Sequence, residues 1–275
     1  MKPRRFDYVR PDSTDEAVAV LAEYGDAASV LAGGQSLMAM LNLRLAEPAV
    51  LVDIASLKEL DYVRVDDGKV EVGAAVTQNQ LKDWPELAAK LPLLATVLPF
   101  VGHFQTRNKG TVCGSIAHAD PSSEIPLVLA TLGGEVVLQS HRGTRVLAAA
   151  DFQRGTLTTA REPDELIMAV RFPVHPTARV AFREVARRHG DFAIIAVAAC
   201  VEDRNTVRIG IGGIADRPAA RRATIGRAAA AKDIFESLAI ELKGYDDLHA
   251  SARLRRDLLR RIGPVVVEEA LRCAA

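Results

Sequence analysis

The sequence predicts an α+β protein of two domains, the first larger than the second. Strand-like and helix-like segments alternate through the first 175 residues, where two Gly-rich segments each lie beside an apolar run. The segment 173–177 carries two prolines within four residues, a composition that stiffens a connector. Three strand-like runs and then Ala- and Arg-rich helical sequence follow it. A chain of 275 residues is long enough for two such domains.

The first elements are predicted from capping residues and apolar spacing. Ser13, with Glu16 three residues later, marks a helix start, and Gly25 marks the end of that helix. Residues 29–31 form a short apolar strand that leads into the first Gly-rich segment. Apolar residues at helical spacing then predict a helix over 35–45.

The rest of the first domain contains a predicted hairpin and further helices and strands. Asp66-Asp67-Gly68 between two Val-rich runs predicts a β-hairpin. Thr77 begins a helical stretch that is broken at Pro85. The other predicted elements are a strand at 49–54, a helix at 91–98, strands at 134–139 and 145–148, and a last strand at 166–172.

The second domain is predicted as a three-stranded sheet covered by helices. Its strands are expected at 178–185, 194–201 and 207–211, where β-branched and other apolar residues are concentrated. The Arg- and Ala-rich stretch 217–231 is interpreted as an exposed helix face, and helical sequence continues to the end.

Composition excludes several classes of function. The chain has 35 basic and 35 acidic residues, so it lacks the net positive charge that is typical of nucleic-acid binding. No apolar run approaches the roughly 20 residues of a membrane span. The basic start of the chain lacks the apolar region of a secretory signal, so we expect a cytoplasmic protein.

Metal and nucleophile motifs are missing from the sequence. The three cysteines are isolated, which predicts neither a disulfide framework nor an iron–sulfur cluster. The six histidines show no ligand spacing, and there is no G-x-S-x-G elbow. Gly210 to Ala215 fit G-x-G-x-x-A after a strand, but Asp216-Arg217-Pro218 follows where a Rossmann helix would open. We therefore expect no metal site, no catalytic side chain and no dinucleotide site at 210–215.

The two Gly-rich segments are the strongest functional signal. Residues 31–37 read LAGGQSL, and residues 110–121 read GTVCGSIAHADP. Glycine lets a backbone approach a ligand closely, and successive free N–H groups form a nest for anions. Two such nests can hold the two phosphates of a dinucleotide, although each segment taken alone is also compatible with a tight turn.

Together these segments resemble the FAD-binding medium subunit of the xanthine dehydrogenase / carbon monoxide dehydrogenase family of molybdenum hydroxylases. The resemblance covers essentially the whole chain, continuing through 164–167, 172–173, 187–193 and 207–213. It implies a two-lobed PCMH-type FAD-binding domain at 1–175. A smaller domain like the C-terminal domain of the carbon monoxide dehydrogenase flavoprotein would follow at 178–275.

The resemblance also implies which residues contact a non-covalently bound FAD. Gly33 and Gly34 would let the backbone approach the pyrophosphate, Ser36 would donate its hydroxyl, and Glu124 would lie against the ribityl chain. The first set is Ser29, Val30, Leu31, Ala32, Gly33, Gly34, Gln35 and Ser36. The second set is Gly110, Thr111, Val112, Cys113, Gly114 and Ser115. Further contacts are expected from Asp120, Glu124, Ile125, Leu166 and Phe182, although Asp120 is equally suited to capping its own turn.

Three positions depart from the pattern of the family. Relatives commonly read Thr-x-Gly-Gly-Asn where this chain has Cys113 and Ser115, and they often have Lys where it has Glu184. Serine keeps a donor and an acceptor, so we expect binding to survive that change. The cysteine indicates that its position does not need a positive φ angle.

As for function, the resemblance implies an oxidoreductase subunit that transfers electrons. Molybdopterin and two [2Fe–2S] clusters would lie in separate large and small subunits, in a dimer of heterotrimers that reduces an external acceptor. One alternative is a stand-alone flavin oxidase of the vanillyl-alcohol-oxidase kind. That enzyme needs a substrate domain, for which the second domain is small. The other alternative is a non-catalytic nucleotide-binding or assembly module.

Overall fold

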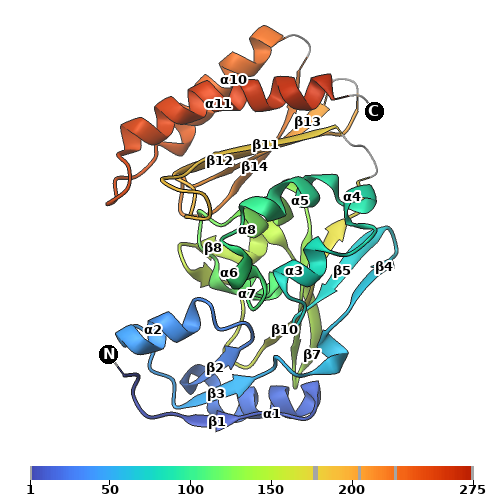
Figure 1. Ribbon diagram of the computed structural model, residues 1–275, viewed down its shortest axis with the longest axis vertical. Coiled ribbons are helices and arrows are strands. Elements are labelled where there is room, and N and C mark those ends of the chain that lie inside the picture. Colours follow the sequence, from blue (N-terminus) through green and yellow to red (C-terminus); the bar gives the residue numbers. More distant parts are fainter. Residues whose placement is uncertain (1, 176–178, 204–205, 226–227, 274–275) are drawn as a thin grey trace.

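The protein mixes helices and strands in several layers, as predicted (Figure 1). The computed structural model describes residues 2–175, 179–203, 206–225 and 228–273. Figure 1 shows a small N-terminal lobe, a central layer of helices and strands, and a C-terminal layer in which helices α10 and α11 cover one sheet. The two lobes expected for the first domain are therefore present.

The N-terminal lobe is a parallel three-stranded sheet of order β1-β3-β2. The Ser13 hydroxyl accepts from the amide of Glu16 and caps α1, and Gly25 ends that helix with a φ of 51°, as the sequence predicted. The elements of this lobe are β1 (Asp7–Val9), α1 (Thr14–Tyr24), η1 (Gly25–Ala27), β2 (Ala28–Leu31), α2 (Leu37–Leu43) and β3 (Val50–Asp53).

The second lobe is an antiparallel five-stranded sheet of order β4-β5-β10-β6-β7, packed against short helices. The predicted hairpin is present, and Asp67 and Gly68 both have positive φ, as a two-residue type I′ turn requires. The sheet strands are β4 (Val63–Asp66), β5 (Lys69–Gly73), β6 (Glu135–Ser140), β7 (Gly143–Ala148) and β10 (Leu166–Pro173).

Helices and a small hairpin surround this sheet. They include a nine-residue helix, α8, for which the sequence analysis had no prediction. The remaining elements are η2 (Lys58–Leu60), α3 (Gln78–Lys82), α4 (Leu87–Lys90), α5 (Pro92–Val97), η3 (Leu98–Phe100), α6 (Phe104–Arg107), α7 (Val112–His118), α8 (Glu124–Leu132), α9 (Ala149–Phe152), β8 (Gln153–Gly155) and β9 (Thr158–Thr159).

The C-terminal sheet has four strands, so the prediction of three was wrong. The fourth strand lies in the Arg- and Ala-rich stretch that was interpreted as a helix face, and it pairs along the edge of β13. Ala and Arg favour helices intrinsically, but strand pairing overrides that preference here. The elements are β11 (Val180–Val185), β12 (Ile195–Val201), β13 (Thr206–Gly212), β14 (Ala219–Thr224), α10 (Ala228–Leu242) and α11 (Ala252–Arg272).

Each face of this sheet packs against a different layer. Along β12, Ala196, Ala198 and Cys200 belong to the same core as the N-terminal and second lobes. Ile195 and Val197 belong to a second core with α10 and α11. This alternation is the two-residue period of a strand that is buried on both sides. The proposed boundary between domains at 175–178 stays a prediction, because residues 176–178 of the proline-containing connector lie outside the described residues.

The glycines of the G-x-G-x-x-A pattern allow α8 to pack closely on the sheet. A Cβ atom at Gly210 would overlap the hydroxyl of Thr131, which donates to the carbonyl of Leu127 at 2.7 Å. A Cβ atom at Gly212 would lie 3.4 Å from Leu127. The backbone then turns at Gly213 with a φ of +78°. Helix packing explains this glycine run without a nucleotide.

Gly210→Ala is expected to destabilise the protein by about 1–3 kcal/mol, the usual cost of overfilling a packed interior. Thr131→Ala removes the nearest obstacle, so the double variant should lose less stability than the sum of the two single variants. Urea unfolding of all four proteins measures this coupling. If the stability losses of the two single variants simply add in the double variant, the side chains at 210 and 131 do not compete for the same space.

Candidate functional site

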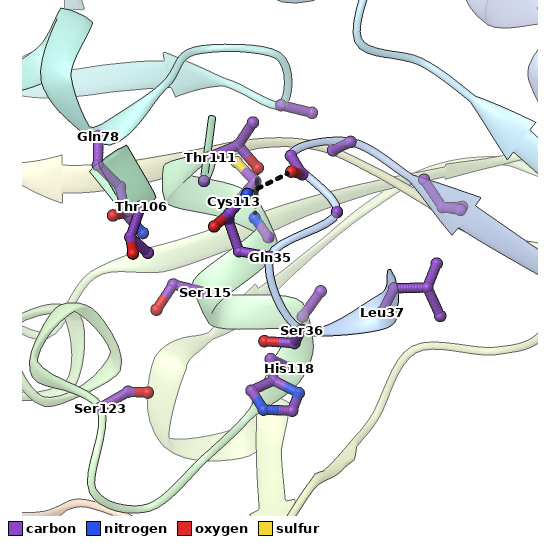
Figure 2. Close-up of a pocket in the computed structure, with 18 of the residues that line it drawn as sticks. Gln35, Ser36, Leu37, Gln78, Thr106, Thr111, Cys113, Ser115, His118 and Ser123 are labelled. Atoms are coloured by element: carbon purple, nitrogen blue, oxygen red, sulfur yellow. Dashed lines mark hydrogen bonds between the residues drawn. The ribbon is translucent and has the colours of Figure 1, made fainter. Parts of the chain in front are cut away.

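A cavity of about 490 Å³ lies where the two Gly-rich segments meet (Figure 2). It is lined by residues of the first lobe, the second lobe and the loop between β11 and β12. Its volume falls within the range of ligand pockets. The cavity therefore gathers residues that are far apart in the sequence.

The first Gly-rich segment connects β2 to α2. Gly34 turns the chain with a φ of +68°, and its carbonyl accepts from the amide of Met38 at 3.1 Å. The side chain of Gln35 folds back and donates to the carbonyl of Gly33 at 3.4 Å, the dashed line in Figure 2. The helix starts at Leu37, two residues later than predicted, so residues 33–36 form a strand-to-helix turn beside the cavity.

Gly33 is where the two segments touch. A Cβ atom there would overlap the carbonyl oxygen of Lys109 and lie 2.7 Å from the Cα of Gly110. The sequence analysis explained this glycine by close approach to a ligand. The structure shows a further reason for a glycine, because the second segment fills the space that a side chain would need. The expected approach of Gly33 to the cofactor stays a prediction.

The second segment, residues 110–121, contains α7 and the residues that flank it. Thr111 caps the helix, its hydroxyl accepting from the amide of Gly114 at 3.0 Å. Gly110 accepts from the amide of Gln78 at 2.8 Å, which ties the segment to α3. Cys113 and Gly114 both have ordinary helical geometry, so the inference that Cys113 needs no positive φ is confirmed. At Gly114 a Cβ atom would lie 2.6 Å from the Thr111 hydroxyl.

Most of the predicted site residues line this one cavity. They are Ser29, Val30, Ala32, Gly33, Gly34, Gln35, Ser36, Gly110, Thr111, Cys113, Gly114, Ser115, Glu124 and Leu166.

The other predicted site residues lie outside the lining, each for an identifiable reason. Val112 and Ile125 are fully buried in the core, and Leu31 lies beneath Gly34. Phe182 packs edge-to-face on Phe100, with ring centroids 5.1 Å apart. Asp120 caps its own turn by accepting from the amide of Ser122 at 2.8 Å, which is the alternative that the sequence left open.

The cavity also contains lining residues that the sequence analysis missed. Some, such as Gly190 and Phe192, lie inside the matching stretch 187–193, which was a usable signal. Others, such as Gln78 and Arg161, are brought in only by tertiary packing. The complete set is Leu37, Met40, Ile54, Ala74, Gln78, Val101, Gly102, Thr106, Ala117, His118, Ser123, Arg161, Ile167, Gly190 and Phe192.

Glu124 lines the cavity and lies close to two further carboxyl groups, those of Glu184 and Asp120. Burial, helped by these two neighbouring carboxyls, raises the pKa of Glu124 to about 8. Burial also raises the pKa of Glu184 to about 7, and its Oε2 has no hydrogen-bond partner among the described residues. Glu124 is only 4% exposed. It therefore enters the cavity as a neutral acid at neutral pH.

A cation and several free polar groups also line the cavity. Arg161 donates to the carbonyls of Glu162, Pro163 and Glu165 at 3.0, 3.2 and 2.7 Å, and burial lowers its pKa. Within the part of the chain that the structure describes, the hydroxyls of Ser36 and Ser115 make no hydrogen bond, and Oε1 of Gln78 is buried without a partner.

The residues present fit an anionic dinucleotide with a planar ring. Helix-start N–H groups and free hydroxyls suit phosphate oxygens, and Arg161 offsets their charge. Leu166, Ile167 and Phe192 provide apolar surface for a ring system. Among residues 2–175, 179–203, 206–225 and 228–273, no group of three or more His, Cys, Asp or Glu side chains is placed to hold a metal ion. In the same ranges no helix is long and apolar enough to cross a membrane.

Comparisons with known proteins agree with this chemistry. Residues 4–175 match the family described as the FAD binding domain in molybdopterin dehydrogenase. The caffeine dehydrogenase subunit beta of Pseudomonas sp. (strain CBB1) is 41% identical over 79% of this chain and 76% of its own length. The carbon monoxide dehydrogenase medium chain of Afipia carboxidovorans is 37% identical over 79% of this chain and 77% of its own.

The fold is also found in a solved structure. A chain of quinoline 2-oxidoreductase from Pseudomonas putida 86 superposes with a TM-score of 0.91 and 34% sequence identity, and the match covers 98% of both chains. The agreement extends beyond the FAD-binding domain to the C-terminal sheet and helices. The chain therefore belongs to the family of FAD-binding subunits of molybdopterin dehydrogenases, as its two Gly-rich segments indicated.

Proposed function

We propose that this chain holds one non-covalent FAD in the cavity and serves as the electron-transfer subunit of a molybdenum hydroxylase. Electrons would come from [2Fe–2S] clusters of a small partner subunit and leave to an external acceptor. One observation carries the proposal: the two Gly-rich segments touch at Gly33 and line a single cavity. When bound, FAD supplies the redox chemistry, because it exchanges electrons either singly or in pairs.

The protein's own residues would bind and orient the cofactor. The starts of α2 and α7, together with the hydroxyls of Ser36, Thr111 and Ser115, would donate to the pyrophosphate oxygens. Glu124 in its neutral form both donates and accepts, so it suits the hydroxyl groups of a ribityl chain. Leu166 would pack on the flavin ring. The remaining predicted contacts would support the lining residues from behind; they are Leu31, Val112, Asp120, Ile125 and Phe182.

The assembly around this subunit is the second part of the proposal. The relatives named as a medium chain and a subunit beta belong to multi-subunit dehydrogenases. Here a large subunit would carry molybdopterin and oxidise the organic substrate, in a dimer of heterotrimers. We place the complex in the cytoplasm, a location that fits the three free thiols of Cys113, Cys200 and Cys273.

The purified chain is expected to contain one FAD that is released by acid. No described side chain in the cavity needs to form a covalent bond to hold it, because donors to the phosphates are already present. Acid precipitation followed by absorption of the supernatant measures the released flavin. A yellow pellet would contradict non-covalent binding, and a colourless chain that takes up no added FAD would overturn the proposed function.

Ser36→Ala and Ser115→Ala are each expected to weaken FAD binding roughly 10-fold, the effect of losing one hydrogen bond to a charged group. Neither hydroxyl has a hydrogen-bond partner among the described residues, so thermal stability of the FAD-free chain should not change. Fluorescence titration with FAD gives the Kd. Ser237→Ala on α10, whose hydroxyl donates to Asp233 instead, is the matched control and should bind FAD normally.

Stability of the FAD-free chain is expected to fall as pH rises from about 5 to about 8. The folded-state pKa of Glu124 lies above its ordinary value of 4.5, so the folded state binds more protons than the unfolded state in this window. Glu124→Gln should flatten the slope and raise the Tm at pH 8 by a few degrees, an order-of-magnitude figure. Glu23→Gln, on the exposed face of α1, is the control. An unchanged slope in Glu124→Gln would show that Glu124 is not held neutral.

Co-expression with its partner subunits should give a complex that contains molybdenum, iron and flavin. The FAD-loaded chain alone should not oxidise small alcohols or amines, because its described residues contain no group of His, Cys, Asp or Glu placed to hold a metal ion and substrate oxidation would take place in a partner subunit. Metal analysis of the complex and oxygen uptake by the isolated chain measure the two outcomes. Turnover by the isolated chain would favour the stand-alone oxidase instead.

A further inference from the structure

Arg255 is an arginine on the C-terminal helix α11 that is almost completely buried, with 1% of its surface exposed. Its Nη2 donates to Asp247 at 2.6 Å, and its guanidinium lies 4.2 Å from the ring centre of Tyr245. Its Nη1 donates to two backbone carbonyls, those of Ile194 and Gly213, each at 2.5 Å. Asp247 balances the charge, so the two carbonyl contacts need a separate explanation.

The Gly213 carbonyl belongs to a residue that supports one wall of the cavity. The amide of Gly213 donates to the carbonyl of Pro121 at 2.9 Å. Pro121 lies in the turn that precedes α8, and the next residues along the chain, Ser123 and Glu124, line the cavity. Gly213 thus connects Arg255 on one side to the turn that presents Glu124 on the other.

The Ile194 carbonyl belongs to the residue that closes the loop between β11 and β12. The amide of Ile194 donates to the carbonyl of Val185 at 2.8 Å, which fixes the ends of segment 186–193. Within this segment, Gly190 and Phe192 line the cavity. Gly190 packs closely on the loop at Gly102, because a Cβ atom at Gly190 would lie 2.9 Å from the carbonyl oxygen of Gly102.

The two supported residues are also in contact with each other. A Cβ atom at Gly213 would lie 2.6 Å from the carbonyl oxygen of Ile194, so both carbonyls converge on one guanidinium nitrogen. The Gly213 carbonyl is buried and Ile194 is partly buried, so without Arg255 both carbonyls would lose a charged donor. The arginine therefore fixes two separate stretches of the cavity wall relative to the C-terminal helices.

We infer that Arg255 is a positioning residue for the wall of the cavity that faces the flavin. This inference rests on the proposed function, in which Glu124 lies against the ribityl chain and the two Gly-rich segments hold the pyrophosphate. Arg255 reaches the first of these two regions and not the second. Its loss should therefore weaken recognition of the flavin half of FAD while leaving recognition of the ADP half unchanged.

The experiment compares the binding of FAD with that of ADP in the full-length chain. Arg255→Met fills similar space without donors, and Arg255→Lys keeps the charge but has a single nitrogen. We expect Arg255→Met to raise the Kd for FAD roughly 10-fold or more, with a smaller increase in Arg255→Lys. The Kd for ADP, measured by competition against FAD, should stay within about 2-fold of wild type in both.

Gly263→Ala is the matched control for a general loss of stability. Gly263 lies on the same helix, and a Cβ atom there would overlap the ring of Phe235 in the C-terminal core, away from Ile194 and Gly213. At a similar fall in Tm, this variant should keep the wild-type ratio of the FAD and ADP dissociation constants. Hydrogen exchange should increase in segments 119–124 and 186–193 of Arg255→Lys and remain normal in 28–36.

The possible outcomes separate this inference from the proposed function. If the wild-type chain binds no FAD, the proposed function fails. If the wild type binds FAD but Arg255 variants weaken FAD and ADP in parallel, as a destabilised chain would, Arg255 has only a structural role. If Arg255→Met does not fold, Arg255→Lys and its exchange pattern decide, and wild-type exchange in 119–124 and 186–193 would overturn the inference.

Discussion

The cavity depends on the contact between Gly33 and the backbone at Lys109 and Gly110. These residues belong to different lobes, and each lobe has its own sheet. Because no side chain separates the two backbones, the start of α2 and the start of α7 face the same space. An anion between them can be reached by N–H groups from both helices, which one Gly-rich turn alone cannot provide. Gly33 is thus required for assembling the site, whether or not a ligand is bound.

The C-terminal sheet completes the site by the same means. Gly210 and Gly212 let α8 lie close to β13, and the Gly213 turn holds the residues that lead into α8. Glu124 is the first residue of that helix, so its position in the cavity depends on how α8 packs on the sheet. The resemblance to G-x-G-x-x-A is therefore a consequence of backbone packing. Three glycine-rich stretches serve the cofactor site here, and only two of them line it.

Local signals in the sequence predicted local structure well. The Ser13 cap and the Asp67-Gly68 turn depend on adjacent residues, and both formed as expected. The fourth strand, β14, was missed because its Arg and Ala residues favour a helix until β13 offers an edge to pair with. Within the site, the Gly-rich segments were found from sequence. Arg161 and Gln78 were not found, because no local sequence pattern indicates that tertiary packing will bring them to the cavity.

The charge state of the cavity follows from this architecture. A flavin gains electrons during turnover, and a carboxylate beside it would disfavour the added negative charge. Glu124 lies between α8 and the cavity, and Glu184 lies on the sheet behind it, so burial and mutual repulsion hold the pKa of Glu124 near 8. A neutral acid offers a hydrogen bond to the ligand without that electrostatic cost. Glu184 is a carboxyl group of β11 that helps to keep Glu124 protonated, so the C-terminal sheet contributes to the electrostatics of the cavity as well as to its shape.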